Sequence, residues 1–390
     1  MFELAICEYS KNFKRNLFVA VLMAVVCLVI VVAGSILNYK VEQLKPFKAL
    51  GVEKGYYVAS MPDDIDLKNV SGIEGRYSVK YYSYYSDYDA VTIVGYDDWV
   101  WKNWQPRLSG GVWINKVESG EDCIDVVIGG NIKGLEIGDK ITCYMNVGDY
   151  NTQEVSCNVV GILYPGTKVL GNNQFYAGDM NYLSAYMSVT ESENEQLYLF
   201  AKQEDIVKSG LVGMNTFAWQ VISFSENLSE EQLQKNENYI YAGISGAGMP
   251  YSDFIKASND ILMQDIVLYL PLLLLSIGLV GIVIYTVVRI NVIKERHNYS
   301  VYYLVGADKS ICVKIALVSS FINFICSVMF FLILATLFEV YAIKSNIVFY
   351  LEPGIIVAAI MIYSFMFLYT WMSVRSAFKN RYPLDVLRNR

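Results

Sequence analysis

Four long stretches without a charged residue constrain this sequence more than any other feature. They are residues 17–37, 266–288, 315–338 and 354–374. A helix that crosses the hydrocarbon core of a bilayer needs about 20 apolar residues, whereas an apolar helix of a soluble protein usually keeps a polar face. We therefore predict four transmembrane helices. The first stretch is longer than the apolar part of a signal peptide, about 7–15 residues, so we predict an uncleaved anchor.

The charges between these stretches predict the side of the membrane that each segment faces. Residues 1–16, 289–314 and 375–390 together hold 13 Lys and Arg against five Asp and Glu, whereas 39–265 holds 17 against 31. Because basic segments stay in the cytoplasm, we predict that both termini and 289–314 are cytoplasmic. Residues 39–265 and the loop 339–353 are predicted to lie outside. We expect a multi-pass protein of a bacterial cell (inner) membrane, with the lipid bilayer as its surroundings.

The long outer segment is predicted to be a mixed α/β domain on helical stalks. Runs rich in β-branched and aromatic residues, separated by Gly, Asp and Asn, indicate strands. Residues 229–232 (SEEQ) have the spacing of a capping box, which begins a helix. The chain after the first span can stay helical as far as Pro46, and 252–265 can run as a helix into the second span. Strands are predicted at 56–60, 78–85, 90–94, 123–128, 140–146, 154–163 and 196–202.

The predicted fold class is a membrane protein with four transmembrane α-helices, one plus three, and a large mixed α/β extracytoplasmic domain. The predicted order is an amphipathic cytoplasmic helix at 1–16, spans at 17–37, 266–288, 315–338 and 354–374, the outer domain with its stalks at 38–265, a cytoplasmic loop at 289–314, an outer loop at 339–353 and a cytoplasmic tail at 375–390. In the N-terminal helix, Phe2, Ala5, Ile6 and Tyr9 are predicted to share one face, turned to the membrane surface.

Four tyrosines close together in the outer segment have two interpretations. Tyr81, Tyr82, Tyr84 and Tyr85 would suit a recognition patch, since aromatic side chains are enriched where proteins bind partners. They also suit the strands of a β-rich domain, where tyrosine is favoured. We favour the second interpretation and keep the patch as a candidate site.

The outer segment also holds three cysteines, Cys123, Cys143 and Cys157. Three cysteines cannot all pair, so the sequence allows one disulfide or three free thiols. The sequence contains no C-x-x-C motif, so it gives no support for a zinc or redox site.

Motifs for catalysis or nucleotide binding are missing. The single histidine, His297, lies on the predicted cytoplasmic side, which excludes a Ser-His-Asp triad or a histidine metal site from the outer domain. Residues 161–168 (GILYPGTK) resemble a phosphate-binding loop, but Thr167 and Lys168 stand in exchanged order and Pro165 removes an N–H. Charged residues that mark an ion path are absent from the spans. We predict a non-catalytic membrane subunit without a metal or cofactor of its own, and no nucleic-acid partner.

Three motifs, met in order along the chain, resemble one family. Residues 296–311 (RHNYSVYYLVGADKSI) resemble the loop after the second span of FtsX/MacB-type ABC transporter permeases. Residues 135–141 (LEIGDKI) followed by 159–163 (VVGIL) resemble a strand pair of that family's outer domain, and 382–388 (YPLDVLR) resemble its closing Pro-x-x-x-Leu-Arg. On these motifs and the four-span order, the sequence is identified as a member of this family.

The sequence departs from the family pattern at three positions in the cytoplasmic loop. Asn298 stands where family members usually have an acidic residue, and Tyr303 stands where they usually have an arginine. Val305 replaces a common leucine. These departures leave open the contacts that the two family charges would make with a partner.

The resemblance implies a mechanism and its partners. Such permeases act as dimers with two cytoplasmic ABC ATPase subunits, so we expect a second permease copy or a paralogue, and ATP with Mg²⁺ bound in the ATPase. ATP hydrolysis there would move the outer domain, for export or removal of peptides, lipoproteins or antimicrobial agents.

The same resemblance implies where the ATPase is contacted. A coupling helix within 294–314 is expected to lay apolar residues into a groove of the ATPase, and Gly306 is expected to end that helix in the left-handed conformation. The expected contact residues are Arg296, Val301, Leu304, Val305, Gly306, Ala307, Asp308 and Lys309. A second cytoplasmic contact is expected at Pro383, Leu387 and Arg388.

Two other functions fit the same layout. One is an FtsX-like regulator of a cell-wall hydrolase, although the outer segment, 39–265, is large for that group. The other is a membrane-anchored sensing or adhesion protein that has no ATPase, which would tolerate Leu304→Asp.

Overall fold

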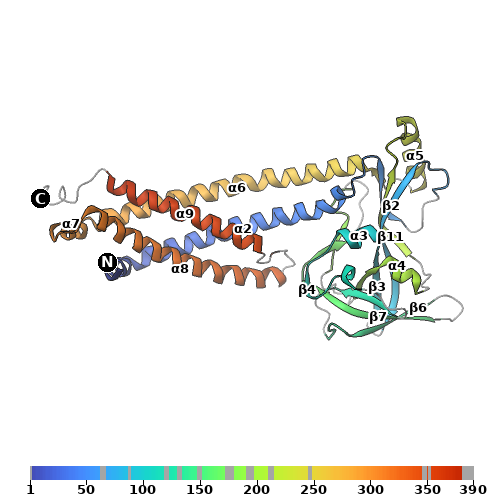
Figure 1. Cartoon of the computed structure of the whole chain (residues 1–390), viewed down its shortest axis with the longest axis horizontal. Helices are drawn as coiled ribbons and strands as arrows, with labels where there is room; N and C mark the ends of the chain where they lie inside the picture. The colour runs from blue at the N-terminus through green and yellow to red at the C-terminus, as the bar shows by residue number, and fades with distance from the viewer. Residues whose placement is uncertain are drawn as a thin grey trace. The chain divides into compact units, whose positions relative to one another are not determined.

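The computed structural model describes residues 2–61, 67–86, 89–117, 123–129, 134–146, 152–171, 180–189, 197–209, 215–244, 248–344, 349 and 353–379. These residues divide into two compact units (Figure 1). The helical unit lies within Met1–Asn38, Asp265–Ser345 and Phe349–Arg390, and the sheet unit within Tyr39–Gln264.

Four of the described helices are long and apolar enough to cross a membrane. They are α2 (Phe13–Ala49), α6 (Tyr251–Lys294), α8 (Lys309–Lys344) and α9 (Pro353–Lys379). At 1.5 Å per residue, α2 and α6 are about 55 and 66 Å long, roughly twice the thickness of a bilayer core. Both helices therefore continue well beyond a membrane, as stalks.

Helix α2 passes Pro46, where the sequence predicted its end. The Pro46 ring removes one backbone donor from the last turn, but its carbonyl still accepts a hydrogen bond from the Leu50 amide at 3.2 Å. The helix ends three residues later, at Ala49.

A short N-terminal helix, α1 (Phe2–Lys11), packs against α8 in the helical unit. The small Ala5 is buried, and the Tyr9 hydroxyl lies 3.5 Å from Cys326 Sγ. Phe2 and Ile6 are exposed, whereas Ala5 and Tyr9 lie on the buried face together with Glu8. The contact of this helix with the membrane surface stays a prediction. Packing against α8, where Ala5 permits close approach, decides which face is buried.

The sheet unit contains a mixed sheet that closes on itself. Its described strands follow the order β12-β1-β11-β2-β3-β10-β5-β7-β4, and β6 pairs with both β2 and β7. Six strands, β2, β3, β10, β5, β7 and β6, therefore form a ring. The pairs β10–β3 and β5–β7 are parallel and the other pairs in the ring are antiparallel. The strand bounds are β1 Gly55–Met61, β2 Ile73–Ser86, β3 Asp89–Tyr96, β4 Leu108–Gly111, β5 Ile124–Ile128, β6 Lys140–Asn146, β7 Thr152–Leu163, β10 Leu197–Lys202, β11 Asn215–Phe224 and β12 Gly248–Pro250.

Side chains alternate along the ring strands, and one set fills the interior. Because successive strand residues face opposite sides, residues two apart share the core: Tyr82, Tyr84, Val91, Ile93, Ile141, Cys143, Val155, Cys157, Leu197 and Leu199 are all buried in one cluster. Tyr82 and Tyr84 are therefore core residues, 2% and 3% exposed. The patch interpretation is wrong for these two tyrosines.

The other two members of the tyrosine group are Tyr81 and Tyr85. Tyr81 is half-buried, and its hydroxyl lies 3.2 Å from Met187 Sδ. The side chain of Tyr85 lies outside the described part of the structure.

Helix α5 (Glu230–Gly243) packs on the part of the sheet formed by β1 and β11, since its Ile240 shares a buried cluster with Val58 and Ile222. This helix begins with the predicted capping box between Ser229 and Gln232. The other short elements of the sheet unit are α3 (Asp98–Asn103), a 3₁₀ turn η1 (Ile114–Lys116), α4 (Gln203–Lys208), and the two-stranded sheet of β8 (Lys168–Leu170) and β9 (Tyr186–Ser188).

The sheet-unit ends of α2 and α6 are buried in this unit. The Phe47 ring of α2 lies 5.5 Å from Trp219 of β11 and 5.2 Å from Phe254 of α6. The Tyr186 hydroxyl donates to the Gln43 carbonyl at 3.0 Å, and the Tyr251 hydroxyl donates to the Phe47 carbonyl. Aromatic packing and buried hydrogen bonds thus fix both stalk ends to the sheet.

The three cysteines of the sheet unit are free thiols in this structure. Cys143 and Cys157 lie on neighbouring strands β6 and β7 with their sulfurs 4.0 Å apart, inside the ring. Cys143 and Cys157 are buried, and Cys123 is half-buried.

Candidate functional site

The segment that joins α6 to α8 forms a short helix, α7 (Arg296–Leu304). Its C-terminal end is closed by a backbone hydrogen bond that requires a glycine with positive φ. Gly306 has a φ of 99°, and the Ala307 amide donates to the Tyr302 carbonyl at 2.9 Å. This six-residue bond is part of the Schellman motif, which satisfies carbonyls at a helix end.

The next helix, α8, begins directly after Asp308. The Asp308 carbonyl accepts from the amides of Ile311 and Cys312, and its carboxylate accepts from the Ser310 hydroxyl. An acceptor immediately before a helix satisfies donors that the first turn leaves free. The chain therefore turns between two helices within four residues, 305–308.

Apolar side chains at the end of α7 are exposed. Val301, Leu304 and Val305 are 41%, 62% and 84% exposed. The other face of α7 is buried, since Tyr299 is 2% exposed and its ring packs against Phe378 of α9 at 5.3 Å. We call Val301, Leu304 and Val305 the apolar tip. Its side chains are exposed, while the opposite face of α7 packs against α9.

Several residues predicted for the coupling site are described only in part. Gly306 and Asp308 are exposed and Ala307 is half-buried beside the apolar tip. The side chains of Arg296 and Lys309 are not among those described, and Pro383, Leu387 and Arg388 lie outside the described residues.

The sequence did not predict the polar contacts behind α7. Glu8 and Glu295 are 9% and 7% exposed, and both accept hydrogen bonds from side chains of other helices or helix junctions. Glu8 and its partner Tyr299 are 291 residues apart in the chain, so no local pattern marks them as neighbours. Asn298, where the family's usual acid falls, donates to the Glu295 carboxylate.

Burial shifts the pKa values of two groups in this region. It raises the pKa of Glu8 from 4.5 to about 7; the Tyr299 hydroxyl lowers this pKa, Glu295 raises it and Lys11 lowers it. Burial also raises the pKa of Tyr299 well above its ordinary value, with Glu8 adding to the effect. The Tyr299 hydroxyl therefore keeps its proton and is the donor to Glu8.

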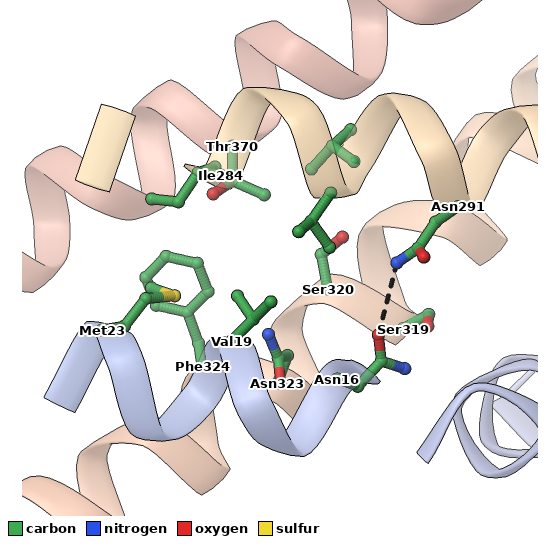
Figure 2. Close-up of a pocket in the computed structure, with 12 residues that line it drawn as sticks. Asn16, Val19, Met23, Ile284, Asn291, Ser319, Ser320, Asn323, Phe324 and Thr370 are labelled. Atoms are coloured by element: carbon green, nitrogen blue, oxygen red, sulfur yellow. Dashed lines mark hydrogen bonds between the residues drawn. The ribbon is translucent and has the colours of Figure 1, made fainter. Parts of the chain in front are cut away.

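A small polar cavity lies between α2, α6, α8 and α9 (Figure 2). Asn16 and Asn291 both line it, and the Asn291 amide donates to Asn16 Oδ1 at 3.3 Å. The amide oxygens of Asn291 and Asn323 are buried without a hydrogen-bond partner. The volume is about 30 Å³, enough for about one or two waters that would satisfy them. The hydrogen bond between Asn16 and Asn291 joins α2 to α6 beside the cavity.

Comparisons with solved structures give likenesses to parts of transporters. The chain is similar to the extracellular domain of the noncanonic ABC-type transporter YknZ from Gram-positive bacteria, at 11% identity and a TM-score of 0.26, over 50% of this chain and 98% of that one. It is also similar to the periplasmic region of MacB from Actinobacillus actinomycetemcomitans, at 9% identity and a TM-score of 0.26, over 52% and 92%. No family model and no curated protein matches the sequence. At this identity and TM-score, neither likeness decides which substrate or partner this chain has.

Proposed function

We propose that this chain is the permease subunit of an ABC transporter complex. A separate cytoplasmic ATPase docks on the apolar tip of α7, and ATP hydrolysis there moves the sheet unit. The observation that carries this proposal is the exposure of Leu304 and Val305, 62% and 84%, in a segment between two membrane-length helices. Burying a leucine or valine side chain yields about 1.5–3 kcal/mol, so a cytoplasmic protein with an apolar groove would bind here.

The two stalks support a mechanical role. Helices α2 and α6 each run from the helical unit into the sheet unit as one continuous helix. In the sheet unit their ends are fixed by Phe47, Trp219 and Phe254. A continuous helix transmits displacement, whereas a flexible linker absorbs it.

The proposal includes partners that follow from the motif resemblance. The complex would contain two permease subunits, identical or paralogous, and two ATPases that bind ATP and Mg²⁺. It would lie in a bacterial cell membrane with both termini of this chain in the cytoplasm. Its substrate class would be peptides, lipoproteins or antimicrobial agents, exported or removed at the outer face.

Co-purification tests the docking site. The full chain, extracted from its host in mild detergent, is expected to retain an ABC ATPase that is identified by its nucleotide-binding motifs. Leu304→Asp should weaken this association at least about 30-fold, because it removes an apolar contact and buries a carboxylate. Val207→Asp in α4 is the matched control, since Val207 is also 62% exposed but belongs to the sheet unit.

Two results would refute the proposal. One is that the wild-type chain retains no ABC ATPase under conditions that keep it folded. The other is that Leu304→Asp and Val207→Asp retain the ATPase equally well.

A further inference from the structure

Two helix junctions in the helical unit are hydrogen-bonded to each other. Asn12 is the residue between α1 and α2, and Glu295 is the residue between α6 and α7. The Asn12 amide donates to Glu295 Oε1 at 3.0 Å, across 283 residues of sequence. This bond therefore joins two junctions between helices rather than two helix faces.

A second contact lies beside the first. The Tyr299 hydroxyl of α7 donates to Glu8 Oε1 of α1 at 2.7 Å. The Asn298 amide donates to the other oxygen of Glu295, so both carboxylate oxygens of this residue are occupied. Hydrogen bonds to a carboxylate are stronger than those between neutral groups, and a buried carboxylate that loses its donors is costly. The junction is therefore expected to stay closed.

A third contact continues the series towards the membrane. Asn16, in the second turn of α2, is 3% exposed. Its amide donates to the Tyr9 carbonyl of α1, and its oxygen accepts from Asn291 of α6, both at 3.3 Å. The cavity of Figure 2 lies directly beside this last bond.

We propose that these contacts form a positioning latch that makes α1, α2, α6 and α7 move as one piece. The latch consists of Glu8, Asn12, Asn16, Asn291, Glu295 and Tyr299. Without it, a displacement of α7 would reach the sheet unit through α6 alone, by the covalent connection. With it, the same displacement also reaches α2, the other helix that continues into the sheet unit. This inference rests on the proposed function, because it assigns the latch a part in transmitting ATPase movement.

The test exchanges donor and acceptor across the junction. Asn12→Asp places two carboxylates about one hydrogen-bond length apart and removes the donor. Glu295→Gln removes the charge from the other side. The double variant, Asn12→Asp with Glu295→Gln, restores an amide facing a carboxylate in the opposite sense. A merely structural loss of the Asn12 side chain would not be repaired by a second substitution.

The first measurement is hydrogen exchange of the α1 amides in the full chain, reconstituted in lipid nanodiscs. Asn12→Asp should speed this exchange about ten-fold or more, since a hydrogen bond to a charged group is worth at least one factor of ten in an opening equilibrium. The double variant should return to within about three-fold of the wild type. Unchanged exchange in Asn12→Asp, or no recovery in the double variant, would overturn the latch.

The second measurement adds the ATPase. Asn12→Asp should keep its affinity for the ATPase, because the apolar tip is untouched, but should lose at least about ten-fold of the permease-dependent change in ATPase rate. The double variant should recover this change. If Asn12→Asp loses affinity for the ATPase as strongly as it loses the permease-dependent change in ATPase rate, the transmitting role is overturned. If the wild-type chain binds no ABC ATPase, the proposed function fails, while the exchange measurement still reports on the latch.

Discussion

We predict that the buried Glu8 makes the docking of α1 depend on pH. Burial raises the pKa of Glu8 from 4.5 to about 7; when α1 leaves the bundle, its carboxyl returns to water and to its ordinary pKa. Between pH 4.5 and 7 the docked state therefore binds more protons than the undocked state. The stabilisation that is fully present below pH 4.5 is lost as the pH rises towards 7.

The size of this effect follows from the same two values. At about 1.4 kcal/mol per pH unit, the difference between 4.5 and about 7 corresponds to roughly 3 kcal/mol of docking free energy. Glu8 is 9% exposed, so little of this is screened by solvent. Glu8→Gln keeps an acceptor for the Tyr299 hydroxyl but stays neutral. In this variant the docking of α1 should therefore not weaken as the pH rises.

Hydrogen exchange of α1 in nanodiscs between pH 5 and 8.5, corrected for the intrinsic exchange rate, measures this docking. The wild type should open progressively more as the pH rises to about 7, whereas Glu8→Gln should be flat and better protected at pH 8. Glu3→Gln, an exposed glutamate on the same helix, is the matched control and should follow the wild type. A flat wild-type profile, or a slope that persists in Glu8→Gln, would refute the assignment.

Two further substitutions test local features. Gly306→Ala should destabilise the end of α7 by about 1–2 kcal/mol, since φ is 99° and the open space around the glycine leaves only the backbone cost. Faster hydrogen exchange of the Ala307 amide would show this loss, and Gly306→Asn should cost less. Equal protection of this amide in the wild type and both variants would contradict the prediction. Tyr82→Ala should destabilise the sheet unit by about 3–5 kcal/mol, because the side chain is 2% exposed inside the ring. Thermal unfolding should report little change for the control Tyr241→Ala, which is 56% exposed, and a Tyr82→Ala protein as stable as the wild type would contradict the core assignment.

Features with a local sequence signal were predictable. Uncharged apolar length predicted the four long helices, and the capping box predicted the start of α5. Strands β1, β2, β3, β5, β6, β7 and β10 lie where β-rich runs occur. The conformation of Gly306 also follows from local chemistry, since glycine alone adopts a φ of 99° without strain.

Features that depend on distant partners were not predictable. Strand β11 is central in the sheet, but its sequence NTFAWQVISF has no clear alternation because both faces are largely covered. Tyr82 and Tyr84 of β2 lie inside a ring that closes through β6, which pairs with β2 near Tyr85. The contact between Asn12 and Glu295 requires the whole bundle to be assembled. In each case tertiary pairing decides what the local pattern leaves open.

The identity of the molecule that touches the apolar tip is the most direct test of the account. A photoreactive residue in place of Val305, which is 84% exposed, should form a covalent adduct in native membranes. We expect the adduct to contain an ABC ATPase, to be identified by mass spectrometry, and to be lost when Leu304→Asp is added. Adducts with lipid alone would contradict the account, because α7 would then rest on the membrane instead of on an ATPase.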